Sequence, residues 1–357
     1  MESTTKPWPT GESPSLGKMN LPSPVRLLEQ VGQRASLWVK DDGNLHPIYG
    51  GNKCRKLVHI LGQATSRHKA EVVTFGTAGS HHVLATGLFA RAWGIPSRAF
   101  LFPQPWSPHA QAVLQASVNS GIRLLPAAFS TATLAATAGC LDSDCYVIAP
   151  GGSSVCGAMG YFEAALELAD QVRTHQLPEP DFIVVAFGSA GTAAGLWAGI
   201  EHAGLRSKIL AVSVLRAPGR LMYARLIAQQ LLNRQRSHAT LDTTRLCMDS
   251  RWVGDGYGFE TAAARTAIDI GVSLDLPLDP TYTGKAFAAA LALVIGDRIG
   301  SIAPVFWPTD SRGVHNVLYW HTLSAMGPSP QSELANVDPI PGNLASLLHR
   351  TPEQQSA

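Results

Sequence analysis

The sequence predicts an α/β protein with two domains, each built on a mostly parallel sheet flanked by helices. The chain has 357 residues, which is more than one hydrophobic core usually accommodates. Short apolar runs alternate with longer helical segments, and this alternation implies right-handed crossovers between parallel strands. Hydrophobic residues make up 45% of the chain and charged residues 15%, a balance typical of a globular protein with much buried surface.

The first series of elements lies between residues 71 and 125. A β-prone run at 72–75 is closed by Gly76, and the helical period at 80–93 ends before a Gly-Ile-Pro turn. Residues 98–102 then predict a strand, 110–120 a helix and 122–125 another strand. Strands separated by helices in this way predict the first parallel sheet.

A second series begins with the apolar strand at 181–187. It continues with a glycine-rich turn, a helix that runs to residue 200 and a strand at 208–215. Residues 303–307 predict a late strand, in which Pro304 favours a start or an edge position. Two α/β halves with a cleft between them are the simplest architecture. The tail at 327–357 is rich in Pro, Ser, Gln and Asn, so we expect it to be loosely ordered apart from a short helix around 344–349.

Composition excludes several classes of function. The net charge of +2 is too small for a nucleic-acid or membrane footprint. The five cysteines are scattered without CxxC spacing, which argues against a disulfide framework and a zinc site and favours a reducing compartment. Residues 1–24 have no apolar core typical of a signal peptide, and the apolar run at 286–296 is too short to span a bilayer. We expect a cytoplasmic protein.

The segment GGNKCRK at residues 50–56 places Lys53 after a glycine turn and before an apolar run. Glycines let the backbone approach a ligand closely. A lysine becomes a nucleophile when desolvation or cationic neighbours, here Arg55 and Lys56, lower its pKa. The alternative for this segment is a basic helix start on the surface.

The segment GSAGTAAG at residues 188–195 follows an apolar strand and precedes a helix. Successive backbone N–H groups and the positive end of the helix favour an anion there. The spacing matches neither GxGxxG nor GxxxxGK[ST], which leaves a site for a single phosphate. The alternative is a turn of small residues that allows close packing. A second turn, PGGSS at 150–154, is the weaker signal.

A reactive lysine and a single-phosphate site together suggest pyridoxal phosphate. With these two features taken together, the chain resembles the fold type II, tryptophan-synthase-β-like enzymes. More narrowly, it resembles the D-cysteine desulfhydrase and aminocyclopropane-carboxylate deaminase family. Six motifs over residues 21–319 carry the resemblance, in the order of the family. They are GGNKCRKL at 50–57, GSHH at 79–82, PGGSSVCGAMGY at 150–161, GSAGTAAG at 188–195, GDGYG at 254–258 and YTGKA at 282–286.

The resemblance implies an internal division of the chain. Residues 1–56 and 162–326 would form a large domain that binds pyridoxal phosphate, and residues 57–161 a small domain. The cofactor would lie in the cleft between the two domains. Residues 327–357 would form the C-terminal tail, and the family suggests a homodimer.

The resemblance also implies the residues that hold the cofactor. Lys53 would carry it covalently, and His81 replaces an asparagine expected near the cofactor's oxygen. Thr309 would direct a hydroxyl at the pyridine nitrogen, which suits elimination of a good leaving group. The remaining cofactor-binding residues are Asn52 at the phenolic side, Lys56 near the phosphate, and Ser189, Ala190, Gly191 and Thr192 as phosphate donors.

The catalytic residues implied are Lys53, which would move the Cα proton, Ser80, Tyr257 and Tyr282. Ser80 would face the substrate carboxylate or transfer a proton, and the tyrosines would line the substrate face. The alternative for each tyrosine is an ordinary core position. No metal site is expected, because adjacent residues such as His81 and His82 rarely share an ion on a helix. Lys285 is the rival for the cofactor lysine, although a lysine at a helix start is usually solvated.

The resemblance therefore implies a lyase that performs β-elimination on a small, D-cysteine-like amino acid and gives pyruvate, ammonia and sulfide. Thr283 stands where cyclopropane-opening members carry glutamate, which favours the desulfhydrase branch. Aminocyclopropane-carboxylate deamination and cysteate sulfo-lysis are the alternatives among enzymes. His81 and Asp310 depart from the family pattern at the substrate end, so a cofactor-binding protein without catalysis is an alternative of another class. A scaffold without the cofactor is a further one.

Overall fold

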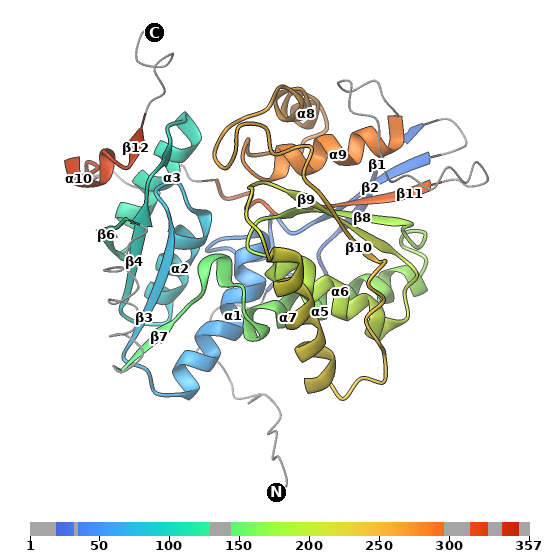
Figure 1. Ribbon diagram of the computed structural model, residues 1–357, viewed down its shortest axis with the longest axis horizontal. Coiled ribbons are helices and arrows are strands. Elements are labelled where there is room, and N and C mark those ends of the chain that lie inside the picture. Colours follow the sequence, from blue (N-terminus) through green and yellow to red (C-terminus); the bar gives the residue numbers. More distant parts are fainter. Residues whose placement is uncertain (1–18, 32–34, 129–143, 296–314, 328–337, 350–357) are drawn as a thin grey trace, which may run out of the picture.

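The computed structural model describes residues 19–31, 35–128, 144–295, 315–327 and 338–349, which form an α/β fold with two main sheets (Figure 1). The larger sheet has the strand order β1-β2-β11-β8-β9-β10, and the smaller one has the order β6-β4-β3-β7. All neighbouring strands in both sheets are parallel except the β1–β2 pair. The predicted fold class is confirmed.

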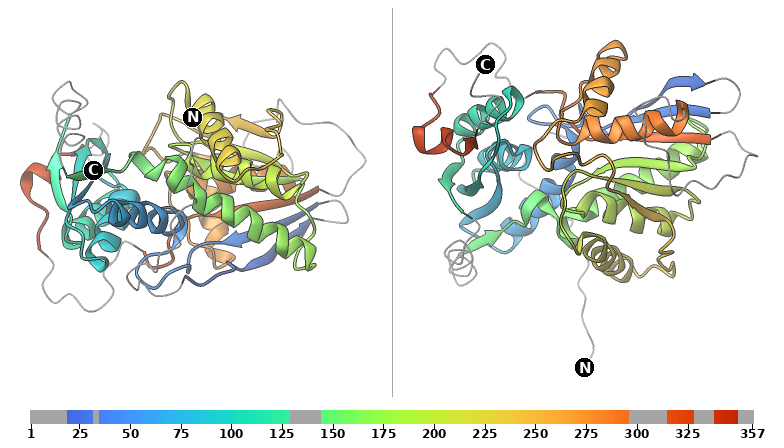
Figure 2. Two further views of the ribbon diagram at one scale, coloured as in Figure 1. Left: turned by 90° about the horizontal axis from the view of Figure 1, so that it is seen from below. Right: turned by 45° about the horizontal axis from the view of Figure 1, so that its top comes forward.

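The larger sheet is covered by helices on both faces (Figure 2). Its β8 strand is apolar throughout, so Ile183 and Val185 pack with α5–α7 while Val184 packs with α9. The strands are β1 (Val25–Val31), β2 (Ala35–Asp41), β8 (Phe182–Phe187), β9 (Lys208–Ser213), β10 (Leu246–Asp249) and β11 (His315–His321). The helices are α5 (Val155–Arg173), α6 (Gly191–Ala203), α7 (Arg220–Arg234), α8 (Ala262–Ser273) and α9 (Thr283–Ile295).

The smaller sheet packs against α1, α2 and α3. Its strands are β3 (Glu71–Thr77), β4 (Ser97–Phe102), β6 (Arg123–Pro126) and β7 (Cys145–Val147). The helices are α1 (Gly51–Ser66), α2 (His81–Ala92) and α3 (Pro108–Asn119), and the 3-10 turn η1 (Pro150–Gly152) leads into α5. The predicted domain boundaries at 56/57 and 161/162 stay a prediction.

The tail differs in part from the expectation. The predicted short helix is observed as α10 (Gly342–Ala345), but the chain then forms the strand β12 (Leu348–His349). This strand pairs in parallel with β5 (Gln104–Pro105), so a helix through residue 349 was wrong. The late strand predicted at 303–307 lies outside the described residues. Within the described ranges, no helix is long and apolar enough to cross a membrane.

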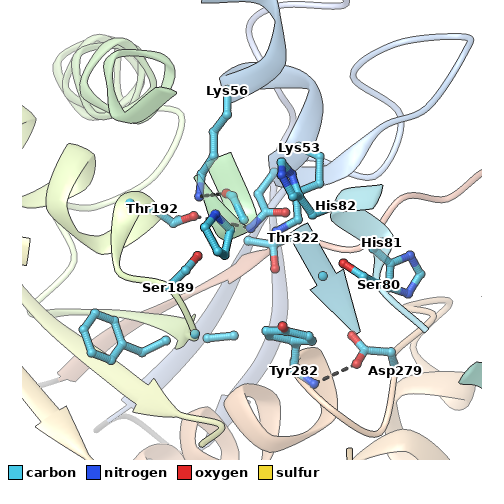
Figure 3. Close-up of a pocket in the computed structure, with 18 of the residues that line it drawn as sticks. Lys53, Lys56, Ser80, His81, His82, Ser189, Thr192, Asp279, Tyr282 and Thr322 are labelled. Carbon is cyan, nitrogen blue, oxygen red and sulfur yellow. Dashed lines mark hydrogen bonds between the residues drawn. The ribbon is translucent and has the colours of Figure 1, made fainter. Parts of the chain in front are cut away.

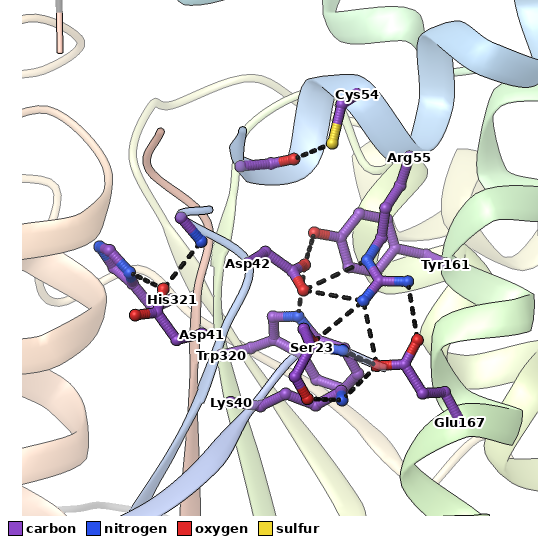
Figure 4. Close-up of polar contacts among 12 residues, drawn as sticks. Ser23, Lys40, Asp41, Asp42, Cys54, Arg55, Tyr161, Glu167, Trp320 and His321 are labelled. Carbon is purple, nitrogen blue, oxygen red and sulfur yellow. Dashed lines mark hydrogen bonds and ion pairs between the residues drawn. The ribbon is translucent and has the colours of Figure 1, made fainter. Parts of the chain in front are cut away.

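A buried network of charges joins β2, α1 and α5 (Figure 4). The Arg55 guanidinium contacts Asp42 Oδ1 at 2.9 Å and Glu167 Oε2 at 3.2 Å. Asp42 also accepts hydrogen bonds from Tyr161 and from the Trp320 indole of β11. The Asp42 carboxylate, which follows β2 and precedes the lysine motif, thus joins three elements of the fold.

Glycines allow α6 to lie very close to α5. A Cβ on Gly195 would come within 2.3 Å of the Ala158 carbonyl oxygen, whereas a Cβ on Gly62 of α1 would meet its nearest atom at 3.8 Å. Gly195→Ala should therefore destabilise the protein by about 1–3 kcal/mol through overpacking. Gly62→Ala, the matched helical control, should be neutral or stabilise by about 0.5–1 kcal/mol. Urea unfolding measures both, and equal effects would contradict the close packing.

Candidate active site

A cavity of about 460 Å³ lies between the two sheets. The ends of β3, β4 and β8 and the starts of α1, α2 and α6 surround it, which is where α/β proteins usually bind ligands. Figure 3 shows Ser189 and Thr192 on one side of the cavity and Ser80 and His81 on the opposite side.

The structure brings together every sequence-predicted site residue that it describes. They line this one cavity and are Asn52, Lys53, Lys56, Ser80, His81, Ser189, Ala190, Gly191, Thr192, Tyr257 and Tyr282. Thr309 and Asp310 lie outside the described residues. The roles of these side chains stay predictions.

Lys53 lies in the first turn of α1, two residues after Gly51, whose backbone packs closely against that of Thr322. Gly51 has φ +71°, and a Cβ there would lie 2.4 Å from the Thr322 carbonyl oxygen, so glycine is required. Burial lowers the pKa of Lys53 to about 8, although the negative charge of Asp279 raises it. No described residue accepts a hydrogen bond from this amine, which leaves it open to the cavity.

We expected the charge of Arg55 to lower the pKa of Lys53, but Arg55 is not among the causes of that shift. Its guanidinium turns away into the network with Asp42 and Glu167, and desolvation is the main cause of the low pKa of Lys53. Lys56 does face the cavity, where its amine donates to the Gly151 carbonyl oxygen at 3.1 Å. Burial and the charge of Lys53 hold the pKa of Lys56 well below its usual value.

The turn before α6 presents donors to the cavity. Ala190 adopts a left-handed conformation, with φ 78°, a strained geometry for a residue with a Cβ. Among the described residues, none accepts a hydrogen bond from the backbone N–H of Thr192 or Ala193, as is usual for the first turn of a helix. Ser153 supports this turn, because its hydroxyl accepts from Gly191 N at 3.0 Å and donates to Ser189 Oγ at 2.8 Å. The second glycine-rich turn is thus part of the same site.

Hydroxyl groups of further side chains line the cavity. Tyr282 donates to Tyr257 at 3.0 Å, and Tyr257 lies 3.3 Å from Thr77 Oγ1. Ser80 caps α2 and is 9% exposed. Burial raises the pKa of both tyrosines, so their hydroxyls stay protonated and can donate hydrogen bonds.

The sequence analysis did not predict three residues that lie at or next to the cavity. Asp279 lines the cavity and accepts hydrogen bonds from the backbone of Thr281, Tyr282 and Thr283. An aspartate just before a helix commonly accepts hydrogen bonds from the first backbone N–H groups, and this preference could have revealed Asp279. Tyr49 and His109 are hydrogen-bonded to the His81 ring. Their separation in sequence gave no signal.

The rival lysine has a structural role. We expected Lys285 to be solvated, but it is fully buried, and its amine donates to the Val253 and Gly256 carbonyl oxygens at 2.8 and 3.2 Å. His82 bonds to Thr74 at 2.8 Å, away from the partners of His81. Across the described ranges, no three His, Cys, Asp or Glu side chains are placed to hold a metal ion.

The cavity fits the cofactor that the resemblance implies. Pyridoxal phosphate requires an amine for its aldehyde and donors for its phosphate. Lys53 supplies a buried amine of lowered pKa, and the first turn of α6 supplies unpaired N–H groups beside Lys56. The Lys53 amine, on α1, and the N–H groups, on α6, therefore line the same cavity.

Known proteins resemble this chain in sequence and structure. A family model described as "Pyridoxal-phosphate dependent enzyme" matches residues 17–305. The D-cysteine desulfhydrase of Salmonella schwarzengrund is 31% identical over 314 residues, which cover 82% of this chain and 92% of that protein. The D-cysteine desulfhydrase of Salmonella paratyphi A is 30% identical over 312 residues, with the same coverage.

Two solved structures are similar. The crystal structure of an ACC deaminase homologue has a TM-score of 0.71 and 25% identity, and the match covers 94% of this chain and 97% of the other. A hydrogen sulfide-producing enzyme from Fusobacterium nucleatum has a TM-score of 0.55 and 13% identity, with coverage of 86% and 94%. The second likeness concerns the fold alone.

Proposed function

The chain belongs to the family of pyridoxal-phosphate dependent enzymes, and from this premise we propose that it is a lyase that performs β-elimination on a small, D-cysteine-like amino acid. The products would be pyruvate, ammonia and sulfide. The proposal depends on one observation, which is that a single cavity contains three features. They are the Lys53 amine, the hydroxyl groups of Ser80, Tyr257 and Tyr282, and an anion cradle, by which we mean residues 189–193 at the start of α6. The D-cysteine desulfhydrases to which the chain is similar support the choice of substrate.

Each part of the cavity has a chemical role in this proposal. When bound, pyridoxal phosphate withdraws electrons from the substrate Cα and makes its proton acidic. Lys53, as the neutral amine, takes that proton. Ser80 orients the substrate carboxylate, and the Tyr257–Tyr282 pair packs against the side chain. Thr192 and the α6 N–H groups would hold the phosphate, and Asn52, whose amide lies 3.3 Å from the Thr192 hydroxyl, would bind the phenolic side.

The direct test is a panel of D- and L-cysteine, aminocyclopropane carboxylate and cysteate, with sulfide, sulfite, ammonia and 2-oxo acid measured. Release of sulfide and pyruvate from cysteine is expected. Turnover of either other substrate alone would favour the corresponding alternative. A yellow protein whose absorbance responds to none of these amino acids would support cofactor binding without catalysis.

Capture of added pyridoxal phosphate by the cofactor-free protein should depend on pH. Only the neutral amine attacks an aldehyde, and the pKa of Lys53 is lowered to about 8. The capture rate should thus rise through pH 7 and level off above about pH 9. Stopped-flow absorbance measures the rate. A rate that is still rising tenfold per pH unit at pH 9.5 would show an amine of ordinary pKa.

Thr192→Val should raise the dissociation constant for pyridoxal phosphate about tenfold, which corresponds to about 1.4 kcal/mol. The change keeps the shape of the side chain but removes a hydroxyl from the anion cradle. Fluorescence titration of the cofactor-free protein measures the constant. Thr266→Val on α8, whose hydroxyl donates to the Ala262 carbonyl at an exposed position, is the matched control and should change nothing. An unchanged constant for Thr192→Val would remove this side chain from the phosphate site.

Cytoplasmic location and a homodimer are also part of our proposal. Cys54, Cys145, Cys156 and Cys247 are free thiols, which suits a reducing compartment. Light scattering on the purified protein would distinguish a dimer from a monomer of 37.9 kDa.

A further inference from the structure

Three titratable side chains form a continuous hydrogen-bonded chain behind the substrate end of the cavity. The Tyr49 hydroxyl is hydrogen-bonded to His81 Nδ1. His81 Nε2 lies 2.7 Å from His109 Nε2. Figure 3 shows His81 next to Ser80, on the side of the cavity opposite the anion cradle. Both ring nitrogens of His81 are therefore used within the protein.

The bonds of this chain can reverse direction. A neutral imidazole has one donor nitrogen and one acceptor nitrogen. Tyr49 can donate to His81, which then donates to His109. Alternatively His109 donates to His81, which then donates to Tyr49. Passage between the two arrangements moves one proton equivalent from one end of the chain to the other.

The surroundings keep the central imidazole neutral. His81 lies in the first turn of α2, where the positive end of the helix disfavours an imidazolium. His109 lies in the first turn of α3. Burial, His109 and Lys53 lower the pKa of His81 to about 3, although Asp279 raises it. The charged and titratable groups around His81 are thus Tyr49 and Lys53 near the start of α1, His109 on α3 and Asp279 before α9.

The two ends of the chain face different spaces. Tyr49 lines the main cavity. His109 is half-buried and lines a separate cavity of about 10 Å³, together with Asp279 and Tyr282. That volume is about the space of one water molecule. His81, which lines both cavities, joins Tyr49 to His109.

A thiol does not need such a chain. Cysteine has an ordinary pKa of about 8.5, so sulfide leaves as a stable anion near neutral pH. Water has a pKa of about 15.7, and a hydroxyl substituent leaves well only if it receives a proton as its bond breaks.

We propose that Tyr49, His81 and His109 deliver a proton to the departing β-substituent, and that the enzyme therefore also accepts β-hydroxy amino acids of the serine type. This proposal rests on the proposed function. Lys53 takes the Cα proton, and the Cβ–O bond breaks with its electron pair on oxygen. Tyr49 Oη gives its proton to that oxygen, and water leaves. The relay starts from the arrangement in which His109 Nε2–H donates to His81 Nε2 and His81 Nδ1–H donates to Tyr49. Tyr49 then regains a proton from His81 Nδ1, His81 Nε2 takes one from His109 Nε2, and solvent protonates His109 Nδ1, which leaves the chain in the other arrangement until the bonds reverse again. Tyr49 is the catalytic member, and the histidines act through it.

The test compares two leaving groups in each variant. Serine requires the proton, whereas β-chloroalanine loses chloride without one. Tyr49→Phe and His109→Gln should each lower kcat for serine about tenfold or more, with kcat for β-chloroalanine within about twofold of wild type. His59→Gln is the control, because His59 pairs with Glu163 on the outer face of α1. Both enantiomers of each substrate are tested.

A second measurement does not depend on turnover. The bond between the two imidazoles should give a downfield N–H proton resonance in the resting protein. The resonance should be absent in His109→Gln and present in His59→Gln.

The outcomes are distinguishable. A parallel loss with serine and β-chloroalanine, or consumption of β-chloroalanine but not serine by the wild type, overturns the proton chain and leaves β-elimination standing. Inactivity towards β-chloroalanine, serine and cysteine alike overturns both proposals. A downfield resonance that persists in His109→Gln also overturns the chain.

Discussion

Lys53→Ala should lower kcat for cysteine about 10³-fold or more and abolish covalent trapping of the cofactor by borohydride. Lys53 supplies a buried amine inside the cavity, with its pKa lowered to about 8. The variant loses both the amine that would hold the cofactor and the base that would take the Cα proton. Sulfide release and peptide mapping of the reduced protein measure the two effects.

Lys285→Met is the control for this prediction. Burial lowers the pKa of Lys285 to about 8 as well, so low basicity alone does not distinguish the two lysines. Lys285, however, is engaged with two backbone carbonyls. The Lys285 variant should still trap the cofactor at position 53. An adduct that maps to Lys285, or that survives in Lys53→Ala, would refute the assignment.

Arg55→Met should destabilise the protein by about 3–5 kcal/mol. Arg55 is 2% exposed and faces Asp42, which is fully buried, and Glu167. Without the guanidinium, the Asp42 carboxylate remains in the interior with two hydrogen bonds and no neighbouring cation in direct contact. Urea unfolding measures the loss, and a value below about 1 kcal/mol would mean that the network contributes little.

Acid should reduce the difference between Arg55→Met and wild type. Burial raises the pKa of Asp42 and of Glu167, but the charges and hydrogen bonds of Arg55 and Lys40 outweigh this effect and lower both. Carboxyls with a depressed folded pKa contribute stability above their unfolded pKa and lose it as the pH falls through the folded value. The comparison variant is Arg173→Met, whose ion pair with Asp170 is more than two-thirds exposed. It should change stability by no more than about 1 kcal/mol.

The sequence predicted the parts of the molecule whose chemistry is local. The strand at 182–187 and the turn that leads into α6 are visible from an apolar run followed by small residues. The run VLYW within β11 was an equally readable signal that we did not use. The hairpin β1–β2 was missed because its strands mix charged residues with apolar ones.

The partners within the site could not be predicted in the same way. Arg55 looked like a neighbour of Lys53, since they are two residues apart, but its partners Asp42 and Glu167 are 13 and 112 residues away. His81 and His109 meet because β3 and β4 pair in parallel, which places the helices that follow them side by side. Contacts between residues that are far apart in the sequence follow from the topology of the sheet, and the identity of a single residue does not predict them.

The order of strands in the larger sheet has a consequence for synthesis of the chain. β2 lies between β1 and β11, and its register pairs Ala35 with His315 and Asp41 with His321. On the ribosome, the first hairpin is therefore made long before its neighbour, and one side of β2 stays unpaired until nearly the whole polypeptide has emerged. The segment that carries Lys53 comes soon after β2 in the chain. We therefore expect its surroundings to be completed late, after β11 has been synthesised and has paired with β2.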